Sequence, residues 1–239
     1  MDYYERALTN HILASRRDTP GTDSPEVTYF VGMGPGVRRA FGNTGTCCGG
    51  TGLEDHTKYQ DSVYFRSTDG DALYVNLPLA ATLRWPERGL VVEQTSDYPA
   101  DGVRTLTFRE GGGRLALKLR IPSWATAGVT VTVNGAPHRG PARPGTCLTL
   151  NRNWRPGDRV STTYRLRVER ALDDPSTQAL FHGPLLLTAQ SPEQGANAIS
   201  PASRPPHFTT HGLTLAPFHI GDDTPYHAYF TRSEPVRTC

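Results

Sequence analysis

The chain has 239 residues, and its 25 Lys and Arg residues nearly balance its 23 Asp and Glu residues, which leaves a net charge of +2. With 36% hydrophobic residues and a mean hydropathy of −0.47, the composition is that of a globular protein, and its near-neutral charge argues against a nucleic-acid-binding protein. No apolar run reaches the roughly 18 residues of a membrane span, and no apolar stretch follows the first residues, so we expect neither a membrane span nor a signal peptide.

The first 66 residues contain two helical patterns separated by a glycine-rich stretch. Tyr4, Leu8 and Ile12 recur at a spacing of four, which predicts a helix from Asp2 to Arg17. Thr51 and Glu54 have the spacing of a capping box, which predicts a second helix at about residues 52–64. The residues between the helices are expected to be irregular.

From residue 73 onward the hydrophobic period changes to two, which is typical of strands. Asn134-Gly135 and the segment from Arg155 to Asp158 predict tight turns, and the spacing from turn to turn is typical of a β-sandwich. A further apolar run covers residues 178–189, and two or three more strands are expected between His207 and Phe230. The predicted strands before that run are residues 73–77, 90–94, 105–108, 115–121, 129–133, 146–150 and 160–169.

The predicted fold class is mainly β, with one or more sandwich domains after the two helices. We expect a helical segment over residues 1–66, a sandwich over 67–170 and a C-terminal β segment over 171–239, with a linker at 191–206. Two helices at one end are too few to form a layer of their own. The helical segment is therefore expected to belong to a larger helical domain.

The residues with the clearest chemical potential are Cys47 and Cys48, two of the four cysteines. Adjacent cysteines do not easily form an ordinary disulfide, because the peptide between them is strained. A helix N-terminus stabilises a thiolate, the form that binds zinc or attacks carbon. The alternative is that one cysteine is merely a small buried apolar residue. Two thiolates also leave a four-coordinate zinc site incomplete.

Other residues carry weaker signals. The histidines at the C-terminal end fall in alternating strand patterns without a recognised metal-ligand spacing. The adjacent aspartates are expected to form a turn rather than a calcium site. Two of the tryptophans are expected to fill a sandwich core rather than stack on a sugar. These residues are His207, His211, His219 and His227, then Asp222 and Asp223, and finally Trp85, Trp124 and Trp154, of which Trp124 and Trp154 are the two core candidates.

Several motifs together closely resemble glycoside hydrolase family 127, the β-L-arabinofuranosidase family. The resemblance covers nearly the whole chain to about Gln190. Its motifs run from Tyr3 to Asn10 (YYERALxN), through Tyr29-Phe30, from Cys47 to Phe65 (CCGGTGLEDH and the following residues), and through the strand at 73–77, RIPSW at 120–124, VNG at 133–135, WRPGD at 154–158 and HGPL at 182–185.

This resemblance implies a retaining glycosidase with an (α/α)6 catalytic barrel followed by β-sandwich domains, so that the two helices would be a remnant of the barrel. Cys47 matches a zinc-bound cysteine that serves as the nucleophile, and Cys48 matches a further zinc ligand. Tyr29 matches a tyrosine that lines the sugar pocket. Zinc is the implied cofactor, and glycans that contain arabinofuranosides are the implied partners.

The sequence departs from the family pattern in one respect. The remaining zinc ligands of the family, in a Glu-x-Cys motif, and its acid/base glutamate lie upstream of the helix with which this chain begins. Glu5 and Glu54 are not expected to replace the acid, because Glu5 lies in a structural helix and Glu54 fits a capping role. We therefore expect a fragment that lacks glycosidase activity and holds zinc weakly, if at all.

Two further expectations follow. Without other barrel helices, the apolar side chains of the first 66 residues, including Leu8 and Val63, should be exposed, so this segment should be poorly ordered and prone to self-association. The alternative function is a non-catalytic sandwich module that packs on a barrel or binds carbohydrate. The sequence does not define the localisation, although export is plausible for a protein that acts on glycans.

Overall fold

The computed structural model describes residues 1–17, 26–42, 45–166, 168–172, 177–190, 200–201, 208–210, 213–220 and 224–231. The fold is mainly β, as the sequence predicts. The chain forms two compact units, the first made of Met1–Asp2 with Lys58–Leu166 and the second of Tyr3–Thr57 with Arg167–Cys239. The predicted domain boundaries after residues 66 and 170 stay a prediction.

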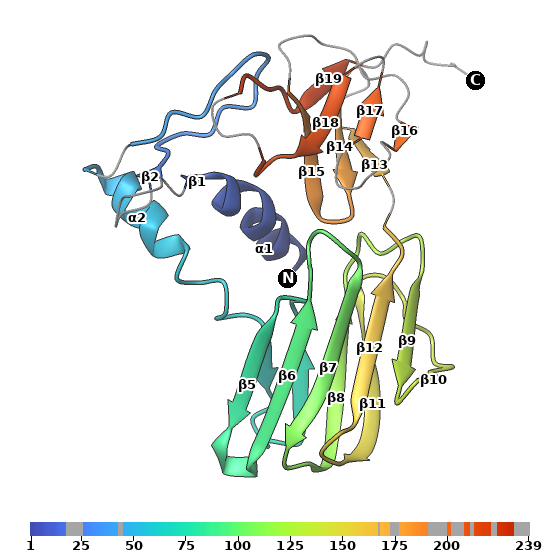
Figure 1. Ribbon diagram of the computed structural model, residues 1–239. Coiled ribbons are helices and arrows are strands. Elements are labelled where there is room, and N and C mark those ends of the chain that lie inside the picture. The colour runs from blue at the N-terminus through green and yellow to red at the C-terminus, as the bar shows by residue number, and fades with distance from the viewer. Residues whose placement is uncertain are drawn as a thin grey trace. The chain divides into compact units, whose positions relative to one another are not determined.

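The first unit is a β-sandwich of two sheets (Figure 1). All strand pairs in it are antiparallel except β4 with β8. The six-stranded sheet has the order β10-β9-β12-β7-β6-β5, with β10 at Ala136–Pro137, β9 at Val129–Val133, β12 at Arg159–Tyr164, β7 at Val103–Glu110, β6 at Leu90–Ser96 and β5 at Ala81–Trp85. The four-stranded sheet has the order β11-β8-β4-β3, with β11 at Thr146–Trp154, β8 at Gly113–Ile121, β4 at Ala72–Val75 and β3 at Tyr64–Arg66.

The sandwich core forms because alternate apolar residues of both sheets face each other. Trp154 is 1% exposed, stacks on Phe108 with ring centroids 4.5 Å apart, and donates its indole N–H to the Leu115 carbonyl at 3.0 Å. Trp124 is also buried and lies 5.3 Å from the Tyr164 ring. The prediction that Trp124 and Trp154 fill the core is confirmed.

Asn134 joins the two turns that the sequence predicts. Asn134 and Gly135 adopt positive φ values of 51° and 80° between β9 and β10, as a tight hairpin requires. The Asn134 side chain donates to the Asp158 carboxylate at 2.7 Å and accepts from the Arg159 N–H at 2.7 Å. The hydrogen bond from Asn134 lowers the pKa of Asp158. Both predicted turns are confirmed.

The RIPSW motif begins with a buried arginine, Arg120. Arg120 donates to the Asn76 carbonyl at 3.1 Å and to the carboxylate of Asp2. Burial alone would raise the pKa of Asp2, but the hydrogen bonds from Arg120 and Ser123 outweigh it and lower the pKa. The Asp2 carboxylate therefore stays ionised, and its negative charge balances the positive charge of the buried Arg120 guanidinium.

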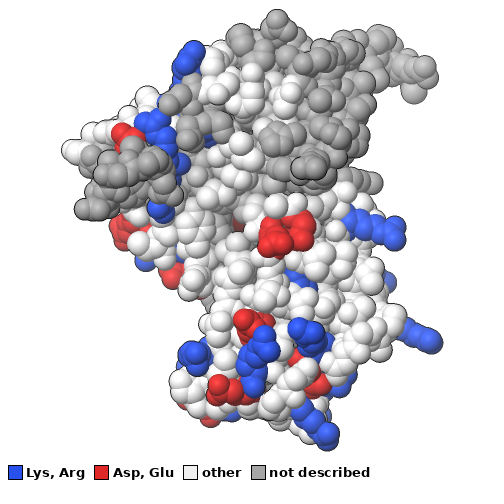
Figure 2. Space-filling model, viewed as in Figure 1, with Lys and Arg blue, Asp and Glu red and all other residues white. Residues whose placement is uncertain are grey.

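On the face of the sandwich that Figure 2 shows, acidic and basic side chains are interspersed. Among the described residues, no helix is long and apolar enough to cross a membrane.

The second unit begins with the predicted first helix, which is shorter than expected. Helix α1 (Asp2–Arg6) continues as the π-helix η1 (Ala7–Ile12), and helical backbone ends at Ala14. The predicted end at Arg17 is wrong, because strand β1 (Arg16–Arg17) pairs with β2 (Glu26–Val27). The predicted exposure is also wrong for Leu8, which is 2% exposed because η1 packs beside β15, and for Val63, which is 1% exposed.

The C-terminal part of the second unit is a seven-stranded sheet. Its main path is β13-β14-β15-β18-β17-β16, and β19 also pairs with β14. These strands are β13 (Val168–Leu172), β14 (Thr177–His182), β15 (Leu185–Ala189), β16 (Ser200–Pro201), β17 (Phe208–Thr210), β18 (Leu213–Pro217) and β19 (Tyr229–Thr231). The strands expected between His207 and Phe230 are confirmed. The predicted linker at 191–206 lies outside the described residues except for β16.

Asn10 connects two of the motifs that the sequence singles out. Its side-chain oxygen accepts from the Leu186 N–H at 2.7 Å, and its amide nitrogen donates to the Pro184 carbonyl at 2.9 Å. Asn10 is only 7% exposed. The asparagine of the first helix therefore satisfies two backbone groups of the β14–β15 hairpin, which carries the HGPL motif.

We predict that Asn10→Ala lowers the free energy of unfolding of the second unit by about 2–4 kcal/mol, because two buried backbone groups lose their partners. The measurement is chemical denaturation followed by hydrogen exchange at Leu186. Asn153→Ala, at an exposed position on β11, is the matched control. An equal loss in both variants would show that the Asn10 hydrogen bonds do not support the hairpin.

Candidate functional site

The site centres on helix α2 (Cys47–Asp55), which begins at the cysteine pair. Thr46 is its N-cap, with an extended backbone at φ −113° and ψ 165°, and its hydroxyl accepts from the Gly49 N–H at 3.0 Å. The predicted helix at 52–64 is wrong at both ends, since turns follow from His56 to Val63. The capping role predicted for Thr51 and Glu54 is also wrong, because the Thr46 cap starts the helix earlier and leaves Glu54 in its last turn.

The two cysteines are the first two residues of α2, and their Sγ atoms lie 3.8 Å apart. Cys47 is exposed and Cys48 is half-buried, and neither forms a disulfide. The first backbone N–H groups of a helix have no intrahelical partners, and the helix dipole places partial positive charge there. The cysteines therefore lie within the N-terminal turn of the helix, and not in a loop before it.

Tyr29 contacts the same cysteine pair. It follows β2, and β2 packs against α2, where Gly52 faces the fully buried Val27. Hydrogen bonding to Cys48, together with the charge of Cys48, raises the pKa of Tyr29. The ring is 42% exposed and packs edge-on against Phe30. The structure thus places Tyr29 beside Cys48, which adjoins Cys47.

The spacing of the two sulfur atoms suits two ligands on one zinc ion. Two Zn–S bonds of about 2.3 Å at a tetrahedral angle place the sulfurs about 3.8 Å apart, and the Sγ atoms of Cys47 and Cys48 are separated by 3.8 Å. Within the described part of the chain, no group of three or more His, Cys, Asp and Glu residues could hold a metal ion. The pair therefore fits half of a tetrahedral site.

The other candidates do not join this site. Glu54 lies at the opposite end of α2 from the cysteines, and Glu5 is fully buried in α1. His227 is fully buried, with its ring 4.9 Å from that of Phe230. Burial, assisted by Arg39, lowers the pKa of His219. Cys239, His207, His211, Asp222 and Asp223 lie outside the described residues.

The sequence pattern does not single out Thr46 as the cap, although a threonine directly before the cysteine pair is itself a capping signal. The competing Thr51-x-x-Glu54 spacing and the three glycines at 49, 50 and 52 obscure it, because glycine is unfavourable within helices.

Comparisons with known proteins identify the family of the chain. Residues 1–61 match the family model described as Beta-L-arabinofuranosidase, GH127 catalytic domain, and residues 72–166 match the GH127 middle domain. The two matches together span more than half of the sequence. The chain belongs to glycoside hydrolase family 127. No curated protein sequence matches it significantly.

Solved structures of the family share the fold. The GH127 beta-arabinofuranosidase BT3674 is similar with a TM-score of 0.79 and 20% identity, over 97% of this chain and 45% of that one. Ara127N-Se, a GH127 beta-L-arabinofuranosidase from Geobacillus stearothermophilus T6, gives a TM-score of 0.70 and 20% identity, over 97% and 46%. A third structure, described as a glycoside hydrolase, gives 0.71 and 18%, over 98% and 49%. The chain thus spans less than half the length of these relatives.

We predict that one molecule of phenylarsine oxide bridges Cys47 and Cys48, because a trivalent arsenical needs two thiols within a few ångströms of each other. Intact-protein mass spectrometry measures the adduct after challenge with a monothiol, which removes singly bound arsenic. Cys48→Ser should abolish the resistant adduct, whereas Cys147→Ser, which removes an exposed free thiol on β11, should leave it unchanged. A resistant adduct in Cys48→Ser would contradict the observed pairing.

Proposed function

We propose that the chain supplies the nucleophile region of a retaining β-L-arabinofuranosidase site, with Cys47 as the nucleophile. The observation that carries this proposal is the position of Cys47 and Cys48 in the first turn of the capped helix α2, with their sulfurs 3.8 Å apart. Membership of family 127, in which the matched models are named for this activity, agrees with it.

The proposed chemistry has two displacements at the anomeric carbon. The Cys47 thiolate attacks that carbon, so that a C–S bond forms while the bond to the leaving oxygen breaks and an acid protonates the departing alcohol. Water then attacks the same carbon and gives a proton to the conjugate base of that acid, so that the sugar is released while the sulfur leaves as a thiolate. Because both steps invert the anomeric centre, the configuration is retained overall.

Cys47 and Cys48 would hold a zinc ion, whose charge keeps bound thiols deprotonated near neutral pH. Tyr29 interacts with Cys48, and its exposed ring can line the place where a sugar binds. Among the described residues neither Glu5 nor Glu54 is placed to protonate a leaving group beside Cys47. We propose that the acid and the missing zinc ligands come from outside this chain, which would make the chain a fragment of the active unit.

We predict that the chain binds Co²⁺, a spectroscopic substitute for zinc, through two thiolates. The expected result is a thiolate-to-cobalt charge-transfer absorption that falls by about half in Cys47→Ser or Cys48→Ser and is unchanged in Cys147→Ser. Binding should be much weaker than the roughly 10–16 kcal/mol of complete structural zinc sites, so a chelator should remove the ion readily. Absorption that survives in the double variant Cys47→Ser/Cys48→Ser would refute the assignment.

We also predict that the purified 239-residue chain releases no arabinose from an aryl β-L-arabinofuranoside above the rate in buffer. A single cysteine nucleophile without its acid and complete metal site lacks most of the transition-state stabilisation. The assay follows the coloured aglycone over hours, with the Cys47→Ala variant as the blank. Release that exceeds this blank would show that the chain is catalytically complete.

A further inference from the structure

The sandwich carries a pocket that shares no residue with the cysteine site. It has a volume of about 670 Å³ and is lined by residues 66–70, Trp85, Glu87 and Arg88. The short 3-10 helix η2 (Pro86–Arg88), which connects β5 to β6, forms one wall, and the loop between β3 and β4 forms the other. The volume lies in the range of small-molecule sites.

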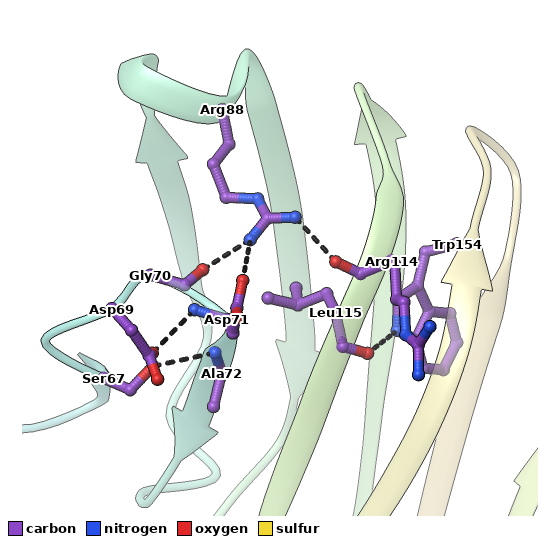
Figure 3. A network of polar contacts seen from close by, with 9 residues as sticks. All are labelled: Ser67, Asp69, Gly70, Asp71, Ala72, Arg88, Arg114, Leu115 and Trp154. Atoms are coloured by element: carbon purple, nitrogen blue, oxygen red, sulfur yellow. Dashed lines mark hydrogen bonds and ion pairs between the residues drawn. The ribbon is translucent and has the colours of Figure 1, made fainter.

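Hydrogen bonds hold the two walls in place (Figure 3). Arg88 donates to the carbonyl of Gly70 and, at 2.7 Å, to that of Arg114, and it pairs with Asp71 at 3.9 Å. Asp69 accepts hydrogen bonds from the Ser67 hydroxyl and from the Asp71 N–H. Because loop and turn are fixed before any ligand arrives, binding would not require them to become ordered.

The polar groups of the pocket favour a neutral ligand with many hydroxyl groups. Arg66 and Arg88 are balanced by Asp69 and Glu87. Basic and acidic side chains lie together at the lower end of the sandwich in Figure 2, where Figure 1 shows the turn from β5 to β6. An anion or a cation would meet repulsion from one of the two sets, whereas a hydroxyl can donate to a carboxylate and accept from a guanidinium.

Trp85 gives the pocket an aromatic surface suited to the apolar face of a sugar ring. Its side chain is 5% exposed, and the guanidinium carbons of Arg66 and Arg88 lie 5.9 and 5.5 Å from its ring centroid. Its buried indole N–H has no hydrogen-bond partner in the described part of the chain. Arg66 is held by an ion pair of 3.0 Å with Glu87 that is more than half exposed, so this side chain can move aside more easily than Arg88.

We propose that this pocket is a glycan-binding site that takes one end or a short stretch of a neutral oligosaccharide. The ligand displaces Arg66 from the indole, places a sugar ring against Trp85 and offers an acceptor to the indole N–H. Glu87 and Asp69 accept hydrogen bonds from sugar hydroxyls. The site goes beyond the proposed function, because it holds a glycan without acting on it and needs neither Cys47 nor Cys48.

The test titrates the full chain with a panel of neutral oligosaccharides built from arabinose, xylose, glucose or mannose, and follows tryptophan fluorescence. At least one of them should change the emission in a saturable manner. Trp85→Phe should abolish that change, because Trp85 lines the pocket whereas Trp124 and Trp154 do not. Isothermal titration calorimetry provides a second readout that does not depend on the fluorophore.

Glu87→Ala should weaken binding about tenfold, the usual effect of losing a hydrogen bond to a charged group. Its matched control is Glu93→Ala, which breaks the exposed Arg109–Glu93 pair outside the pocket and should leave the affinity unchanged. The Cys47→Ser/Cys48→Ser variant should bind as the wild type does, which separates this proposal from the function of the cysteines.

Three results would overturn the proposal. One is that no oligosaccharide of the panel binds at tens of millimolar. Another is that Glu87→Ala and Glu93→Ala bind equally well. The third is that inorganic phosphate produces the same saturable change, since this would make the pocket an anion site.

Discussion

The hydrogen bond from the Gly49 N–H to the Thr46 hydroxyl fixes where helix α2 begins, and the chemistry of the chain depends on that position. It places Cys47 and Cys48 in the first helical turn, at the positive end of the helix dipole. It also brings the Cys48 sulfur within reach of the Tyr29 hydroxyl. A helix that began at residue 52 would leave both thiols in a loop without these fixed neighbours.

The second unit combines elements from both ends of the sequence. Strand β2 packs against α2, and η1 packs beside β15. Asn10 binds the β14–β15 hairpin, while Tyr226 donates its hydroxyl to the Gly32 carbonyl. Buried hydrogen bonds of this kind are costly to leave unmade, so they define one arrangement of the chain. The apolar side chain of Leu8, expected to be exposed, finds its cover in this unit.

Much of the sandwich could be predicted from the sequence, whereas the helices could be predicted only in part. In β8 and β11, apolar and polar residues alternate, and this pattern predicts which side chains are buried. The Asn134-Gly135 pair predicts a turn without further information. Strand β5 alternates apolar and polar residues, but it covers only Ala81–Trp85 directly before Pro86, and it is not among the strands predicted from the sequence. The start of α2 could not be predicted, because Thr46 and Thr51 both offer a cap. The interaction between Tyr29 and Cys48 could not be predicted either, because no local spacing relates these two residues.

The chain belongs to family 127, and we propose that Cys47 and Cys48 bind one metal ion as a pair. X-ray absorption spectroscopy of the zinc-loaded chain tests it most directly. The account predicts two sulfur neighbours at about 2.3 Å with oxygen in the remaining positions, and a single sulfur neighbour in Cys48→Ser. Zinc without sulfur neighbours, or with two that persist in Cys48→Ser, would contradict it.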